Sequence, residues 1–189
     1  LSTNAPHRSS QVHTVSPLAS CLERRDVLAR LPRDPCLQQP AATRPHFPVH
    51  PGISALQLAA AKAGAPLMHD CCTISLSDRL TPWDVIERRI QGAGLGDFVI
   101  ALYNPRSKGR AWQLAKTKEI LLEHRKNSTP VAIARQLGRD NEEIRLTTLG
   151  ELHPEQCDML TVGLVGNSSS YSKDGRMVTP RGYPGAELS

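Results

Sequence analysis

The distribution of glycine divides this chain into two parts. All thirteen glycines lie between Gly52 and Gly185, whereas eight of the fifteen prolines fall within the first 51 residues. Glycine supplies the positive-φ turns and close backbone approaches from which the phosphate and adenosine loops of α/β proteins are built. Any site of that kind is therefore expected after His50. Residues 1–48 are expected to be largely disordered, because proline interrupts both helices and central strands.

Composition narrows the class of protein. The 189 residues are 39% hydrophobic and only 4% aromatic, so aliphatic side chains and alanine must form the core. This is enough for one domain of about 140 residues built from packed helix and sheet layers. The net charge of +5 arises from scattered Lys and Arg, which disfavours nucleic acid as the main partner. No apolar run is long enough to cross a membrane.

The five cysteines predict neither a disulfide framework nor a metal site. Their number is odd, and no pair has the C-x-x-C spacing of a structural zinc site. Cys71 and Cys72 lie in a predicted strand, where buried thiols are expected rather than a reactive pair. His69 and Asp70 are adjacent on an extended segment and so point to opposite faces, and no other spacing gathers metal ligands. The cysteine pattern is typical of the reducing cytoplasm, which is the expected location.

Helix signals begin directly after Pro51. An alanine- and leucine-rich helix is expected over 55–63, with Ser54 as its cap and Gly64 at its end. A second helix is expected to start with Thr81 as the cap and to end near Gln91.

The strand signals complete an α/β pattern. Apolar runs predict strands over 72–76, 98–103, 131–135, 143–149 and 160–165, a third helix ending near Arg125, and a polar tail from Gly175 onward. Helices and strands alternate first and adjacent strands follow. This order predicts a mixed sheet of about five strands flanked by helices.

Three polar loops follow or precede these elements, where α/β sheets place ligands. The first, Pro51–Ala55, opens a helix whose amides face outward, although a simple turn and cap would look the same. In the second, Ser77 and Asp78 are candidate hydrogen-bond acceptors or proton relays, although short turns often carry such residues.

The third loop carries three cations directly after a buried strand. Arg106, Lys108 and Arg110 are placed to clamp carboxylates, with arginine binding bidentately and lysine as a point charge. A solvated loop is the alternative interpretation of the same three residues.

Together these stretches resemble a known enzyme family. The segments Pro51–Ala55 and Gly64–Asp70 are similar to the start of the second domain of the tetrapyrrole (class III) methyltransferases. Within that family, the chain resembles the precorrin-3B C-17 methyltransferases through Ile74–Asp78 with Leu80–Trp83, Ala101–Ser107, Val165–Ser168 and Gly175–Tyr183. The resemblance runs from about Val49 to about Tyr183.

The resemblance implies a reaction, a cofactor and partners. Such enzymes use S-adenosylmethionine to methylate C-17 of precorrin-3B or cobalt-precorrin-3, with ring contraction to a precorrin-4-type product in cobalamin biosynthesis. The corrinoid precursor would then be the substrate, and the intact family implies a homodimer. Neither nucleic acid nor a membrane is expected as a partner.

Cofactor-binding positions transfer one by one from the family. Ser54 and Ala55 match a Thr-Ala or Ser-Ala pair that contacts the bound cofactor. Asn104 stands where relatives place a residue whose backbone meets the adenosine, and Gly138 lies near another adenine-facing glycine. These four residues are the expected cofactor contacts.

The resemblance names no secure acid or base, but ring contraction moves protons and so needs one. Asp78 is the first candidate and Ser77 the second. A substrate with many carboxylates makes Arg106, Lys108 and Arg110 the candidate substrate contacts.

The front of the chain departs from the family pattern. The family's first domain has a Gly-rich loop near its start and a Gly-Asp-Pro-like turn later, and residues 1–48 contain neither. Residues 49–189 are therefore interpreted as the second domain, which would supply one wall of the cofactor cleft and turn over little alone. A shifted frame, a truncation and a domain-split gene all remain open as origins of this front. A non-catalytic α/β interaction module or remnant and a ribosomal RNA methyltransferase of the same fold remain alternative functions.

Overall fold

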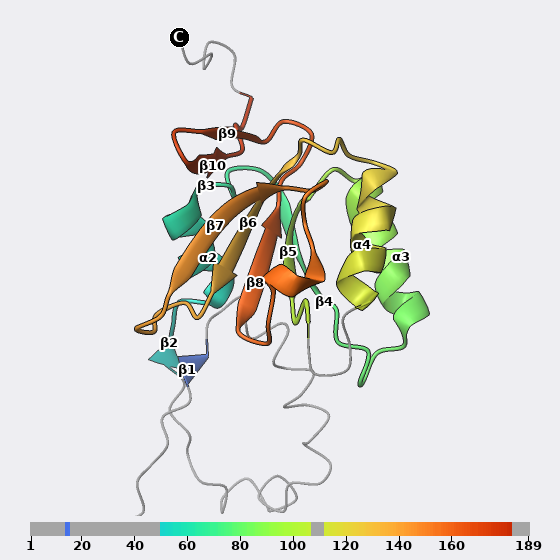
Figure 1. Cartoon of the computed structure of the whole chain (residues 1–189), viewed down its shortest axis with the longest axis horizontal. Helices are drawn as coiled ribbons and strands as arrows, with labels where there is room; N and C mark the ends of the chain where they lie inside the picture. The colour runs from blue at the N-terminus through green and yellow to red at the C-terminus, as the bar shows by residue number, and fades with distance from the viewer. Residues whose placement is uncertain (1–13, 16–49, 107–111, 183–189) are drawn as a thin grey trace, which may run out of the picture. The chain divides into compact units, whose positions relative to one another are not determined.

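The computed structural model describes residues 14–15, 50–106 and 112–182 of the chain (Figure 1). The chain divides into two compact units, Leu1–Ser54 and Ala55–Ser189. In the first unit, strands β1 (Thr14–Val15) and β2 (His50–Pro51) form a short parallel pair. The prediction of disorder over residues 1–48 lies mostly outside the described residues.

A five-stranded mixed sheet forms the centre of the second unit. Its strand order is β4 (Cys71–Ser75), β5 (Val99–Tyr103), β8 (Thr161–Val165), β6 (Pro130–Arg135) and β7 (Glu143–Thr148). Strands β4 and β5 pair in parallel, and the other three neighbouring pairs are antiparallel. Because β8 lies antiparallel between β5 and β6, strands β4, β5 and β6 all point the same way. Their ends therefore share one edge, called here the carboxyl edge.

The two faces of the sheet differ in side-chain size. One face carries large aliphatic side chains, such as Ile100, Leu102 and Ile133, which pack in one core cluster with helices α3 (Trp83–Leu95) and α4 (Trp112–Leu122). The opposite face presents alanines from β5 and β6 to helix α2 (Ala55–Ala63). Helix α2 lies on one side of the sheet and α3 and α4 lie on the other (Figure 1). Small side chains on both partners allow α2 to approach its face closely.

The predicted helix over 55–63 is confirmed, and each predicted strand is found within about one residue of its expected ends. The prediction for the second helix was wrong at both ends. Pro82 is its N-cap, without a side-chain cap hydrogen bond, so Thr81 does not cap it. The helix continues past Gln91 to Leu95 because it packs closely there: a Cβ on Gly94 would lie 2.6 Å from the His124 ring.

A three-stranded sheet corrects the predicted polar tail. Strands β3 (Gly64–Ala65), β10 (Arg176–Val178) and β9 (Tyr171–Lys173) pair in that order. Met177 is fully buried in the core cluster beneath α2. The short, mostly polar segment around Met177 gave no sign that this side chain is buried. Thr179, two residues later, is buried as well.

In the described part of the chain, no helix is long and apolar enough to cross a membrane.

Candidate active site

The carboxyl edge gathers the predicted site loops of the second unit. Ser77 and Asp78 follow β4, Asn104 and Arg106 follow β5, and Gly138 follows β6. In α/β sheets, ligands bind outside the carboxyl ends of parallel strands. The sheet topology therefore brings together residues as far apart in the sequence as Ser77 and Gly138. Lys108 and Arg110 lie outside the described residues.

Helix α2 begins beside the end of β5. The Leu56 backbone N–H donates a 3.1 Å hydrogen bond to the Tyr103 hydroxyl oxygen, and Tyr103 is the last residue of β5. One of the N–H groups that a helix start leaves without an intrahelical partner is thus satisfied by a side chain. The same bond joins the start of α2 to the Tyr103 side chain. Ser54 ends the first unit and directly precedes the helix in the chain.

Asn104 connects the ends of β4 and β5. Its backbone has φ +53, and its side-chain amide donates a 3.1 Å hydrogen bond to the Ser75 hydroxyl oxygen. The Ser77 backbone N–H donates to the same oxygen at 3.3 Å. Asparagine tolerates the left-handed conformation better than most residues, because its short polar side chain can bond locally. The exposed Asn104 backbone is therefore held in one position at this edge.

Asp78 is positioned by helix α4. The Gln113 side-chain amide donates a 3.2 Å hydrogen bond to an Asp78 carboxylate oxygen, and Gln113 is buried in the first turn of α4. Asp78 itself is half-buried. A carboxylate oriented by a buried amide has the fixed geometry that a general acid or base requires. Gln113 was missed at the sequence level, where nothing distinguishes it from a surface glutamine.

The loop after β6 is fixed to α2. Gln136 and Gly138 have positive φ values of 51 and 71, and the Gly138 N–H donates a 2.7 Å hydrogen bond to the Glu142 carboxylate. Glu142 also pairs with Lys62 of α2 at 2.5 Å. The hydrogen bond from Gly138 and then the one from Lys62 lower the pKa of Glu142. Gly138 is thus exposed on a loop that two interactions hold against the helix.

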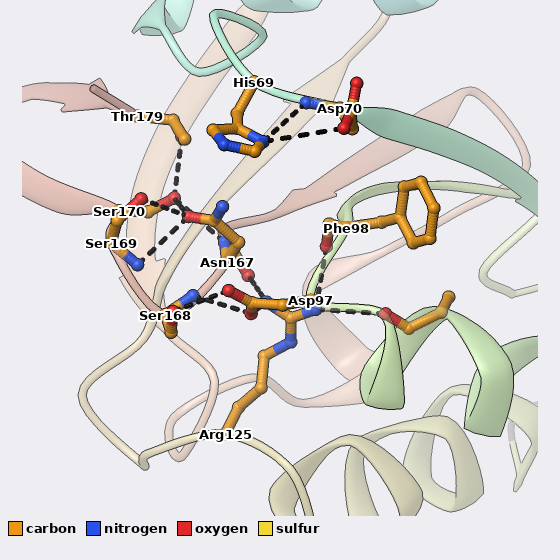
Figure 2. Close-up of polar contacts among 12 residues, drawn as sticks. His69, Asp70, Asp97, Phe98, Arg125, Asn167, Ser168, Ser169, Ser170 and Thr179 are labelled. Carbon is orange, nitrogen blue, oxygen red and sulfur yellow. Dashed lines mark hydrogen bonds and ion pairs between the residues drawn. The ribbon is translucent and has the colours of Figure 1, made fainter. Parts of the chain in front are cut away.

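The end of the sheet opposite the carboxyl edge, where β4 and β5 begin, holds a buried arginine that the sequence analysis did not identify (Figure 2). The Arg125 guanidinium donates to the carbonyl oxygens of Gly166, Phe98 and Ala93 at 2.6, 2.7 and 3.3 Å. It also pairs with Asp97 at 3.2 Å, and its side chain is 0% exposed. The only sequence signal is a cation just after a helix, which normally indicates a solvated end. Arg125 therefore holds the fold together far from the carboxyl edge.

The segment after β8 completes this end of the sheet. The carbonyl oxygen of the Asn167 side chain accepts hydrogen bonds from the hydroxyls of Ser169 and Ser170, at 2.9 and 3.0 Å. Ser170 and Thr179 share a 2.7 Å hydrogen bond, and Ser168 donates to Asp97 at 2.9 and 2.6 Å (Figure 2). The Gly-Asn-Ser segment that carried part of the resemblance therefore has a structural role.

His69 and Asp70 do not form a catalytic pair. The Asp70 backbone N–H donates a 2.9 Å hydrogen bond to His69 Nδ1, while the Asp70 carboxylate lies 4.0 Å from the same nitrogen (Figure 2). Within the ranges that the structure describes, no three His, Cys, Asp or Glu side chains gather as metal ligands.

The thiols differ from the expected buried pair. Cys71 is exposed, so its predicted burial was wrong, while Cys72 is half-buried and Cys157 is buried. Cys71 starts an edge strand, and an edge strand leaves part of its surface uncovered. Burial is the main cause that raises the pKa of Cys72 and of Cys157 to about 11.

Alkaline pH is expected to destabilise the fold through Cys72 and Cys157. A thiol with a raised pKa stays protonated in the folded state after it has ionised in the unfolded state. This contribution to stability is complete below the ordinary pKa of 9.0 and is lost as the pH rises to about 11. Calorimetry should show the Tm falling across this range. The fall should be shallower in a Cys72→Ala/Cys157→Ala double variant than in Cys71→Ala; equal slopes would contradict the prediction.

The fold and this edge define the class of protein: a mixed α/β domain whose predicted site loops lie at the carboxyl ends of its strands. The family model of the Tetrapyrrole (Corrin/Porphyrin) Methylases matches residues 37–153, which is more than half of the chain. The chain belongs to this family, and the fold class predicted from its sequence is confirmed.

The names of similar proteins are more specific than the family model. The chain is 53% identical over 133 residues to the "Probable cobalt-factor III C(17)-methyltransferase" of Salmonella typhimurium, covering 70% of this chain and 55% of that protein. It is 45% identical over 143 residues to the "Precorrin-3B C(17)-methyltransferase" of a Sinorhizobium species, covering 73% and 56%. The resemblance found in the motifs is confirmed. The chain spans about half the length of these two curated relatives.

Solved structures agree with the family. The crystal structure of the methyltransferase CobJ superimposes with a TM-score of 0.73 and 38% identity, over 82% of this chain and 63% of that one. The cobalt precorrin-4 methyltransferase CbiF superimposes with a TM-score of 0.58 at 19% identity, over 82% and 62%, which shows the shared fold alone.

Proposed function

We propose that this chain is part of a methyltransferase that uses S-adenosylmethionine to methylate C-17 of precorrin-3B or cobalt-precorrin-3, with ring contraction to a precorrin-4-type product. The observation that carries this proposal is the meeting of three loops at the carboxyl edge, in a chain 53% identical to a named C(17)-methyltransferase. The homodimer and the cytoplasmic location expected from the resemblance belong to the same proposal.

The residues at the edge suit an adenosine-containing cofactor. Asn104 and Gly138 are exposed, and both hold positive φ values that turn backbone groups outward. A Cβ built on Gly138 would meet only Leu58, at 3.8 Å, so the space beside this glycine is open. Ala55 adds a small side chain at the start of α2. We assign these three residues, with Ser54, to cofactor binding.

The cofactor, when bound, supplies a methyl group that the sulfonium has already activated. The protein must then align donor and acceptor carbon, because positioning alone can supply a large part of the barrier reduction. Asp78, held by Gln113, is assigned to proton transfer during contraction, with Ser77 as the weaker candidate. Arg106, Lys108 and Arg110 are assigned to the carboxylates of the corrinoid.

A docking role is the second candidate function. Four large apolar side chains are exposed in segments at the carboxyl edge: Leu80, Trp112, Met159 and Leu160. Exposed apolar side chains mark a surface that a partner or ligand covers where they form a contiguous patch. Size-exclusion chromatography separates the candidates, because a clean monomer without partner argues against an interface left uncovered. A ribosomal RNA methyltransferase has no such support among the described residues, and an RNA-free preparation that is insensitive to salt would count against it.

The cofactor proposal predicts weak and local binding by this chain. If the chain supplies one wall of the cleft, NMR titration with S-adenosylhomocysteine should give a millimolar Kd, with shifts at Ala55, Asn104 and Gly138. Gly138→Ala should weaken binding about tenfold, because the new methyl group occupies the open space beside the loop.

Gly175 provides a matched control for this titration. It has φ +70, almost the value at Gly138, and nothing lies within 4 Å of its built Cβ, but it belongs to the β9–β10 turn. Gly175→Ala therefore carries the same backbone strain and should leave binding unchanged. Micromolar affinity for the wild-type chain would contradict the one-wall picture, and equal effects of both substitutions would contradict the assignment of Gly138.

A further inference from the structure

A polar cavity of about 400 Å³ opens on the face of the sheet that carries α3 and α4. Three arginines and three acids line it: Arg106, Arg135, Arg145, Glu143, Glu155 and Asp158. Ligand pockets usually measure about 300–1,000 Å³, so this cavity has room for a substituent with its water rather than for a macrocycle.

Cross-strand pairing forms the floor of the cavity. Ile133 of β6 lies opposite Arg145 of β7, and Arg135 lies opposite Glu143. Residues directly opposite each other in an antiparallel ladder share a face, so these four side chains project to the same side. The wall comes from the turn η3 (Pro154–Gln156) and the two residues after it.

Arg106 lies at the carboxyl edge and connects this edge to the η3 wall of the cavity. Its guanidinium donates a 3.3 Å hydrogen bond to the Pro154 carbonyl oxygen. Arg106 follows Asn104 by two residues, so the cavity lies beside the loop assigned to the cofactor. A group held in this cavity therefore lies near the proposed reaction site.

Two of the acids in the cavity share one arginine as their ion-pair partner. Arg135 Nε lies 2.6 Å from an Asp158 carboxylate oxygen, and Arg135 Nη1 lies 4.0 Å from Glu143. Burial acts to raise the pKa of Asp158, but its hydrogen bonds, led by those from Arg135 and Thr161, outweigh burial and lower it. Asp158 and Glu143 are thus committed to Arg135.

Arg106 and Arg145 are left without such a partner. No carboxylate oxygen in the described ranges lies within 4.0 Å of either guanidinium. Burial is the largest effect on the buried Cys157 thiol and raises its pKa. The charges of Arg106 and Arg145 act in the opposite direction on the same pKa. Arg106 and Arg145 thus line one cavity, in which Glu155 is the one lining acid without a described ion pair.

We propose that Arg106 and Arg145 bind one carboxylate side chain of the tetrapyrrole substrate in this cavity, an inference that rests on the proposed function. Arginine presents paired N–H donors that match a carboxylate, and two arginines can hold its two oxygens from different sides. The cavity adds Arg145 to the substrate contacts and fixes the orientation of the macrocycle by one of its substituents. A neutral substituent would leave both guanidinium groups without a carboxylate within ion-pair distance.

Equilibrium binding to the full 189-residue chain tests this inference. The two probes are cobyrinic acid, which is a cobalt corrinoid polycarboxylate, and its fully methyl-esterified form. Their binding is measured by the quenching of tryptophan fluorescence at constant ionic strength. Wild type should bind the acid about tenfold more tightly than the ester. Arg145→Gln should lose about tenfold in affinity for the acid and none for the ester. Arg145 is exposed and has no described ion pair, so this variant should fold normally.

Two further variants control for charge. Arg89→Gln removes an exposed arginine of α3 that does not line the cavity and should bind the acid like wild type. Glu155→Gln removes the remaining lining acid and should tighten binding of the acid about twofold. If Arg145→Gln binds cobyrinic acid as tightly as wild type and Arg89→Gln do, the inference is overturned while the proposed function stands. A wild-type chain that binds S-adenosylhomocysteine but neither corrinoid overturns the inference, and one that binds none of the three overturns the proposed function as well.

Discussion

Arg125→Ala is expected to lower the free energy of unfolding by about 3–5 kcal/mol, the range for breaking a buried ion pair. The substitution leaves the carbonyl oxygens of Gly166, Phe98 and Ala93 without their donor and removes the partner of Asp97. It also opens a void where a fully buried side chain stood. Urea unfolding followed by circular dichroism measures the effect, with the m-value showing whether the transition stays two-state.

Three variants separate charge from geometry at Arg125. Burial lowers the pKa of Arg125, which shows that desolvation opposes the charged form here, and its Nε has no hydrogen-bond partner among the described residues. Arg125→Lys keeps the charge but loses the fork that reaches three carbonyls, and we expect about half of the loss. Asp97→Asn should cost less than Arg125→Ala, because Asp97 is 43% exposed. Lys126→Ala, at an exposed neighbour, should change stability by less than about 0.5 kcal/mol. A loss below about 1 kcal/mol for Arg125→Ala would contradict this account.

The elements of the fold were predictable where one pattern dominated. The unbroken apolar run at Val99–Tyr103 could only be a strand covered on both faces, and α2 was bounded by Gly64. The sequence could not predict that β8, the last strand of the sheet, inserts between β5 and β6. Strand order depends on long-range pairing, and periodicity along the chain contains no information about it.

Long-range packing and strand register also explain why the site was only partly predictable. Asp78 and Asn104 each followed a predicted strand, so the sequence placed them at strand ends. Their neighbours in space could not be predicted: Gln113 is buried under Asp78 by the packing of α4, and Arg145 faces the cavity because of its register with Ile133. A one-residue shift in that register would turn Arg145 to the opposite face.

The same limit applied to Arg125 and Met177. Each is a single residue whose burial the local sequence does not indicate: Arg125 lies between two exposed polar residues, and Met177 lies in a short segment near the end of the chain. Local patterns describe averages over a segment. They cannot identify one residue that is buried by partners far away in the chain.

Substitution at Asp78 is expected to have the largest effect on the reaction. Asp78→Asn should lower the rate of methyl transfer and contraction by about 10²–10⁴-fold, the usual contribution of a positioned acid or base. The amide keeps an oxygen that can accept the 3.2 Å hydrogen bond from Gln113, so the local structure should survive. Single-turnover assays with the protein in excess, following label from S-adenosylmethionine into the corrinoid, record even slow transfer.

Two comparisons show whether the slower rate comes from the loss of proton transfer by Asp78. Asp140→Asn makes the same change at an exposed carboxylate in the loop after β6 and should leave the rate within about twofold, while Ser77→Ala should cost less than about tenfold. Affinity for S-adenosylhomocysteine should be equal in all four proteins, because Asp78 is assigned to the proton and not to the cofactor. A rate for Asp78→Asn within about fivefold of wild type would remove Asp78 as the acid or base. The proposed contraction would then require another group at the carboxyl edge for its proton transfer.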